Sequence, residues 1–120
     1  MKKKILIVED EMIIQLVNRQ IVEEAGYEVC SMVTCADDAI VAVKNLMPDL
    51  ILMDIKLDSP MDGIEAMNEI RKFSNVPVIY ITGNSDPYHL KRANDTGMSD
   101  FLVKPVDFEL MVKAIQNAFI

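Results

Sequence analysis

The sequence predicts one α/β domain in which a parallel sheet is covered by helices on both faces. Five short apolar runs alternate with five segments that carry apolar residues at helical spacing. Runs that short and that apolar are typical of strands buried on both faces of a parallel sheet. Short connections between alternating strands and helices favour the same architecture.

The first apolar run, residues 4–8, predicts a strand. An apolar face at helical spacing indicates the helix that follows, and Gly26 favours its end. Residues 29–33 predict the second strand. The expected helical face consists of Ile13, Ile14, Val17 and Ile21.

Thr34 and Asp37 have the spacing of a capping box, which predicts the start of the second helix. Pro48 ends this helix, and residues 50–53 predict the third strand, with Asp54 directly after it. An ionised carboxylate is costly to bury in an apolar strand, so Asp54 is expected at the carboxyl edge. The inward face of the second helix is expected to carry Ala36, Ile40, Val43 and Met47.

Residues 62–65 predict the start of the third helix. Residues 76–81 predict the fourth strand, with Pro77 near its start, where a missing N–H is tolerated. Asp86 and Pro87 form a good N-cap and first-turn pair for a helix to about Asp95. The third helix is expected to turn Ile64, Met67 and Ile70 inward.

Residues 101–103 predict the fifth strand, and Asp107 is expected to cap the last helix. The inward face of that helix is expected to carry Leu110, Met111, Ala114 and Ala118. We find no linker, so residues 1–120 are expected to form one domain without an output domain.

The composition limits the classes of function that the chain can have. The net charge of −7 argues against direct nucleic-acid binding, which needs clustered Lys and Arg. No apolar run is long enough to span a membrane. Cys30 and Cys35, without a secretory signal, are expected to be reduced thiols in a cytoplasmic protein.

The strand ends predict a site, because ligands of open α/β sheets bind beyond the carboxyl ends of the strands. Clustered carboxylates repel one another unless a cation joins them, and Mg²⁺ prefers such oxygen ligands. With the metal present, one carboxylate can form an aspartyl phosphate, while a lysine and a hydroxyl contact the phosphoryl oxygens. Mg²⁺ is therefore the expected cofactor, with Mn²⁺ as a possible replacement. The polar residues at the strand ends are Glu9, Asp10, Asp54, Thr82 and Lys104.

Over residues 3–119 the chain resembles a response-regulator receiver domain of two-component signalling. The resemblance implies a CheY-like (βα)5, flavodoxin-like, doubly wound sheet of strand order 2-1-3-4-5. The motifs that carry it are Ile7-Val8-Glu9-Asp10, Leu52-Met53-Asp54, Met61-Asp62-Gly63, Ile81-Thr82-Gly83 and Val103-Lys104-Pro105.

The resemblance also implies roles for individual residues. Asp54 would accept a phosphoryl group from a phosphohistidine of a sensor histidine kinase or a histidine phosphotransfer protein. Asp10, Asp54 and the backbone carbonyl of Lys56 would bind Mg²⁺, with Glu9 acting largely through water. Lys104 would pair with the phosphoryl group, and the Lys104–Pro105 peptide bond would be cis.

The resemblance further implies a switch. Thr82 would move to hydrogen-bond the phosphoryl group, and Phe101 would turn inward with it. The shift would remodel the surface of the fourth helix, fifth strand and fifth helix, and so control binding of a downstream protein or a second copy. A complete single-domain regulator and a receiver cut from a larger regulator or hybrid kinase both fit this sequence.

The chain departs from the family pattern in one loop, and two further residues are expected to affect the phosphorylated form. Asp58 stands where many members have proline, and Gly63 comes one residue late, so the loop after Asp54 is longer and more acidic. Lys56 and Asn84, each two residues beyond a motif residue, are expected to tune the lifetime of the phosphorylated form.

Two other classes compete with this interpretation. An aspartate-nucleophile phosphohydrolase would carry a second aspartate two residues after the nucleophile, where this chain has Lys56. A receiver-like interaction module that never carries phosphate would not need the acidic and basic residues at the strand ends. Magnesium binding separates this module from a phosphoacceptor.

Overall fold

A parallel sheet forms the centre of the computed structural model, which describes residues 2–83 and 86–120. These residues form five strands in the order β2-β1-β3-β4-β5, which confirms the expected topology. The strands are β1 (Lys4–Val8), β2 (Glu28–Val33), β3 (Leu50–Asp54), β4 (Val78–Thr82) and β5 (Asp100–Val103).

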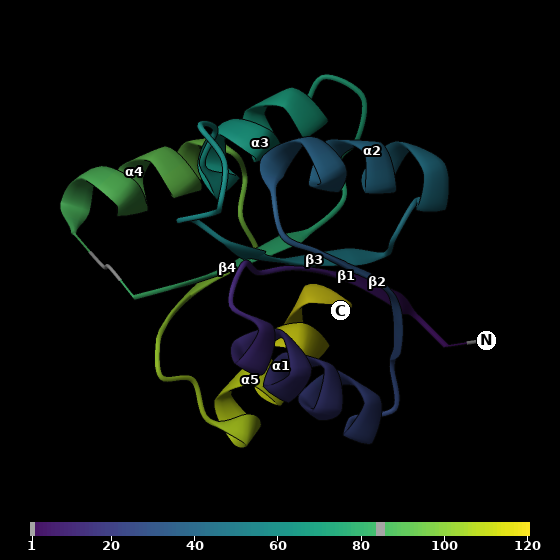
Figure 1. The fold of residues 1–120 in the computed structure, drawn as a ribbon. Helices are drawn as coiled ribbons and strands as arrows, with labels where there is room; N and C mark the ends of the chain where they lie inside the picture. Colours follow the sequence, from purple (N-terminus) through teal and green to yellow (C-terminus); the bar gives the residue numbers. More distant parts are fainter. Residues whose placement is uncertain (1, 84–85) are drawn as a thin grey trace.

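Helices cover both faces of the sheet, as Figure 1 shows. In that view α2, α3 and α4 lie on one face, and α1 and α5 lie on the other. None of the helices in the described part of the chain is long and apolar enough to cross a membrane. The helices are α1 (Met12–Glu24), α2 (Ala36–Leu46), α3 (Gly63–Ile70), α4 (Pro87–Asp95) and α5 (Phe108–Ala118).

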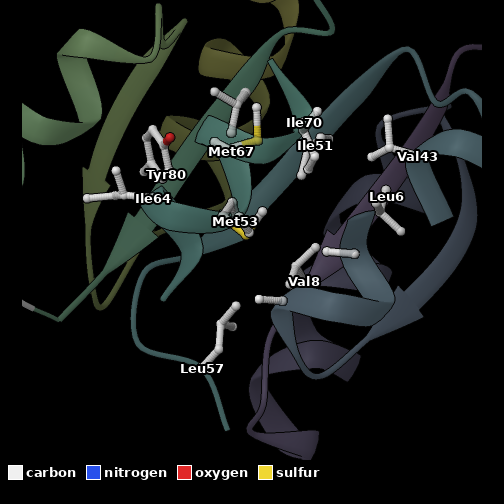
Figure 2. Close-up of a cluster of buried hydrophobic side chains, with 14 of the residues drawn as sticks. Leu6, Val8, Val43, Ile51, Met53, Leu57, Ile64, Met67, Ile70 and Tyr80 are labelled. Atoms are coloured by element: carbon white, nitrogen blue, oxygen red, sulfur yellow. The ribbon is translucent and has the colours of Figure 1, made fainter. Parts of the chain in front are cut away.

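Alternating side chains of the strands form two separate cores. On one face, Leu6, Ile51 and Met53 pack with α2 and α3 (Figure 2). On the other face, Ile5 and Leu52 pack against α1 and α5. Both cores bury strand residues completely, which explains the uninterrupted apolar runs in the sequence.

The strand register brings the functional strand ends to one edge. Val8 pairs with Met53, and Asp54 pairs with Ile81. Asp54 is the last residue of β3, as expected for a carboxylate after an apolar run. Thr82, the last residue of β4, pairs with Val103 immediately before Lys104.

Most helix boundaries follow the expected capping residues. Asp86 and Asp107 accept hydrogen bonds from the backbone N–H groups of His89 and Leu110 at 2.9 and 2.7 Å. Gly26 follows α1 with φ of 93°, a conformation that favours glycine. The N-caps of α4 and α5 and the end of α1 are therefore confirmed.

The capping box expected at Thr34 is wrong. The N-cap of α2 is Cys35, and its side chain makes no capping hydrogen bond. The N–H of Ala36 instead donates to Oγ of Ser59 at 3.3 Å. A hydroxyl from a distant loop has taken the place of the local cap.

Four residues expected on inward faces are exposed. Met47 lies beyond the end of α2, in a left-handed conformation with φ of 45°, and is therefore turned away from the core. The other three lie on apolar helix segments wider than the stripe that the sheet can cover. They are Ile13 and Val17 in α1 and Leu110 in α5.

Candidate functional site at the strand ends

Three carboxylates meet at the carboxyl edge of the sheet. Glu9 and Asp54 are 1% and 5% exposed, although both are acidic. One oxygen from each of Glu9, Asp10 and Asp54 lies within 4.8 Å of the others. The structure thus brings together the acids that the strand ends predicted.

Lys104 joins two of these carboxylates. Its Nζ lies 2.8 Å from Oδ2 of Asp54 and 2.9 Å from Oε1 of Glu9. Burial lowers the pKa of Lys104, but its hydrogen bonds to Asp54 and Glu9 outweigh burial and raise that pKa. The ammonium therefore stays charged beside the two acids.

The acidic cluster disfavours full ionisation. Burial raises the pKa of Glu9, and the neighbouring Asp54 raises it further, while Lys104 opposes the shift. Burial also raises the pKa of Asp10, with the Glu9 carboxyl as the next cause. A divalent cation would relieve this repulsion, and the all-oxygen donor set fits Mg²⁺ or Mn²⁺.

An open cavity of about 380 Å³ gives access to the cluster. Asp10, Asp54, Thr82 and Lys104 line it together with Lys56. Residues with carboxylate, hydroxyl and ammonium groups therefore border one space that is open to a reagent. This arrangement suits a phosphoryl group that is attacked by one oxygen and held by the other groups.

A comparison with known families decides the identity of this fold and site. The family model described as the response regulator receiver domain matches residues 5–116. The chain belongs to this receiver domain family. Members of the family are signalling domains, typically not enzymes, for which phosphorylation and Mg²⁺ bound at an acidic pocket are typical.

Individual relatives agree with this assignment. The receiver domain is 34% identical to the chemotaxis protein CheY of Thermotoga maritima, over 98% of each chain. It is 32% identical to the transcriptional regulatory protein PdtaR of Mycobacterium tuberculosis, over 97% of this chain and 56% of that protein. The chain thus spans little more than half of PdtaR.

A solved structure shows the same fold. The CheX–CheY–BeF3–Mg²⁺ complex from Borrelia burgdorferi matches with a TM-score of 0.93 and 26% sequence identity. The match covers 98% of this receiver domain and 90% of that chain.

For two residues, the sequence did not predict the contacts by which they support the site. Gln15 donates from Nε2 to the carbonyl oxygens of Glu9 and Val33, at 3.1 and 3.4 Å, and so fixes the ends of β1 and β2. A Cβ atom on Gly63 would collide with the carbonyl oxygen of Asp54. Gly63 belonged to a recognised motif, but its close approach to β3 is visible only in three dimensions.

The structure shows where most of the other predicted site residues lie. The Lys104–Pro105 peptide bond is cis, as expected. The half-buried ring of Phe101 lies 6.4 Å from the ring of Tyr80. Lys56 is exposed beside the cavity. Asn84 lies outside the described residues.

The longer loop after Asp54 is anchored at several points. Leu57 is buried, and the Ser59 hydroxyl donates to the Met61 carbonyl at 2.7 Å while it also caps α2. The N–H of Gly63 donates to the carbonyl of Ile55 at 2.6 Å. The extra residue is therefore accommodated by contacts with α2 and with Ile55, directly after β3.

Proposed function

We propose that this receiver domain is a phosphoacceptor switch in which Asp54 takes a phosphoryl group from a phosphohistidine. One observation carries the proposal: the Asp54 carboxylate ends β3 at an open cavity, 2.8 Å from the Lys104 ammonium and beside two further acids. The donor would be a sensor histidine kinase or a histidine phosphotransfer protein.

The transfer is a substitution at phosphorus. An Asp54 oxygen attacks, the new P–O bond forms, and the P–N bond to the donor imidazole breaks. The departing nitrogen keeps the electron pair of that bond, and the imidazole leaves as a neutral group because its other ring nitrogen carries a proton in the phosphohistidine that reacts. Lys104 shifts its ammonium from the Asp54 carboxylate to the phosphoryl oxygens and offsets their charge.

Glu9, Asp10, Asp54 and the backbone carbonyl of Lys56 would hold Mg²⁺, with Glu9 acting largely through water. When bound, the ion neutralises negative charge on the carboxylates and on the phosphoryl oxygens. The cluster of three acidic oxygen donors supports this assignment. Lys56 lines the same cavity, and its side chain together with Asn84 is proposed to set the phosphoryl lifetime.

The output step is a population shift. Thr82 lines the cavity beside Asp54, so a small movement brings its hydroxyl to the phosphoryl group. Phe101 then turns inward from its half-buried position next to Tyr80. The resulting change in the α4–β5–α5 face would control a downstream protein or a second copy.

The surface supports protein partners rather than nucleic acid. Exposed apolar side chains on α1, among them Met12 and Leu16, form a stripe suited to a phosphodonor protein. Tyr88 and Leu90 on α4 are exposed on the proposed output face. The net charge of −7 disfavours contact with phosphate backbones.

The test is phosphorylation by acetyl phosphate, followed by intact mass spectrometry with and without Mg²⁺. We expect a Mg²⁺-dependent gain of one phosphoryl group that Asp54→Asn abolishes. Asp58→Asn, which removes an acidic group from the neighbouring loop, is the matched control and should leave the gain intact.

Absence of any gain under all conditions would contradict the proposal and favour a non-phosphorylated interaction module. Release of phosphate without an adduct calls for a turnover assay. Sustained turnover of a substrate would point to a hydrolase instead.

A further inference from the structure

A second cavity, of about 410 Å³, lies between α1 and the segment after β5. Its walls are mostly apolar, and its volume falls in the range of small-molecule sites. Lys104 borders this cavity as well as the phosphoryl cavity. The apolar wall residues are Ile14, Val17, Ile81, Pro105 and Val106.

Asn18 is the unusual residue of this cleft. Its side chain belongs to a residue only 6% exposed, and it makes no hydrogen bond with any residue that the structure describes. Among the described residues, every fully enclosed side-chain N or O has a hydrogen-bond partner. Since the Asn18 amide has none among these residues, its polar atoms are not fully enclosed, and they reach the open cleft that Asn18 lines.

Folding does not account for an asparagine at this position. Buried amides are normally paired with a protein group or an ordered water, and an unpaired one is destabilising. The neighbours of Asn18 in the cleft are Ile14 and Val17, so an apolar side chain of similar size would suit the site better. The amide is therefore placed to meet a group that enters the cleft.

We propose that this cleft binds a small neutral ligand with an apolar body and a planar amide-like group. The apolar walls take the body, and the Asn18 carboxamide offers both a donor and an acceptor to the amide. An anionic ligand is disfavoured because the Lys104 ammonium is already held by Asp54 and Glu9, at 2.8 and 2.9 Å.

The position of Lys104 between the two cavities can couple ligand binding to the phosphoryl site. The methylene stem of Lys104 can contact the ligand while its ammonium remains with Asp54. A ligand that changes the position of Lys104 would change the equilibrium constant for phosphorylation of Asp54, and phosphorylation would change the ligand affinity by the same factor. This coupling rests on the proposed function, whereas ligand binding does not.

Benzamide is the probe, and binding is followed by the backbone amide resonances of the isotopically labelled 120-residue chain. We expect saturable shifts at Ile14, Val17 and Val106, with a dissociation constant on the order of millimolar for so small a ligand. Benzoate should bind more weakly. Asn18→Leu should weaken benzamide binding by about fivefold to tenfold, the value of one hydrogen bond.

Two controls distinguish a role of Asn18 in ligand binding from a role in protein stability. Asn94→Leu changes an exposed asparagine in a groove on α4 and should leave benzamide affinity unchanged. Asn18→Leu should also raise the melting temperature of the ligand-free protein, whereas a structural asparagine would lower it on replacement. Asn18→Ala provides the same binding test if the leucine variant does not fold.

Equal benzamide affinity in the wild type and in the folded Asn18 variant would overturn the proposal. Shifts in the cleft caused only by a phosphodonor protein, and never by benzamide, would also overturn it and assign the cleft to protein docking. Benzamide binding is measured without a phosphodonor, so failure of Asp54 to take phosphate would refute the proposed function and leave this result standing.

Discussion

Lys104 is the residue that makes two buried carboxylates compatible with folding. Its ammonium contacts both Asp54 and Glu9, and each of those side chains is almost fully buried. Removing one partner of a buried ionic cluster leaves an uncompensated charge, which costs more than the pair contributes when intact. The same residue is the proposed partner of the phosphoryl group.

Lys104→Met should therefore lower the free energy of unfolding of the metal-free protein by about 2 kcal/mol. Mg²⁺ should restore part of this loss, because it replaces the missing positive charge. Urea unfolding with and without Mg²⁺ measures both effects. Lys91→Met removes an exposed ion pair with Asp95 and is the control, with little expected change. A Lys104 variant as stable as the wild type would contradict the prediction.

Asp10 should behave in the opposite way. Burial and the Glu9 carboxyl raise the pKa of Asp10, so its charged form opposes folding at neutral pH. Asp10→Asn should increase metal-free stability by about 0.5 kcal/mol, since solvent screens this accessible side chain. The gain should be full above the raised pKa and should vanish below the ordinary value of 3.8, where aspartate is neutral in both states.

Thermal unfolding across pH in the presence of a chelator measures the effect of Asp10→Asn. The variant should also lose most of its stabilisation by Mg²⁺. Asp58→Asn is the control and should keep that stabilisation. A metal-free Asp10→Asn protein less stable than the wild type at pH 7 would show that this carboxylate supports the fold.

At the scale of the elements, α4 is attached to the rest of the molecule largely by polar contacts. Ala93 is its only buried residue among those described. Arg92 pairs with Asp62 through NH1 to Oδ2 at 3.0 Å and NH2 to Oδ1 at 3.2 Å. Asp62 also caps α3 by accepting from the N–H of Glu65 at 2.8 Å. This pair joins α4 to the start of α3.

A double-mutant cycle between Arg92→Gln and Asp62→Asn tests this connection. Asparagine also caps helices, so Asp62→Asn keeps the α3 cap while it removes the charge. We expect a coupling free energy of about 0.5–1 kcal/mol, because the pair is bidentate and only partly exposed. Urea unfolding of the four proteins measures it, and a zero coupling would mean that Asp62 and Arg92 act independently.

The elements also show what sequence reasoning can and cannot predict. The strands were predicted correctly because each is marked by its own apolar run. The caps Asp86 and Asp107 were predicted correctly because each bonds to a backbone N–H only three residues further on. The start of α2 was wrong because its cap, Ser59, is 23 residues away from Ala36. The clustering of Glu9, Asp10 and Asp54 was predicted from the strand ends. The role of Gln15 was not, because it depends on contacts between separate elements.

At the scale of the whole molecule, the net charge of −7 and the acidic cluster are both expected to respond to added cations. General screening acts on all surface charges and depends on ionic strength. Binding at one site depends instead on the identity of the cation, because a folded site binds it and the unfolded chain does not. The two effects can therefore be separated.

Mg²⁺ should raise the free energy of unfolding by about 2.7 kcal/mol at a concentration one hundred times its dissociation constant. NaCl at matched ionic strength should give a much smaller increase, since screening does not require the clustered oxygens of Asp10 and Asp54. Mn²⁺ should act like Mg²⁺, because it accepts the same ligands. Calorimetric melting in each salt measures the effect. If NaCl stabilised the protein as much as Mg²⁺ does, the acidic cluster would not be a specific metal site, and phosphorylation of Asp54 would need another source of positive charge.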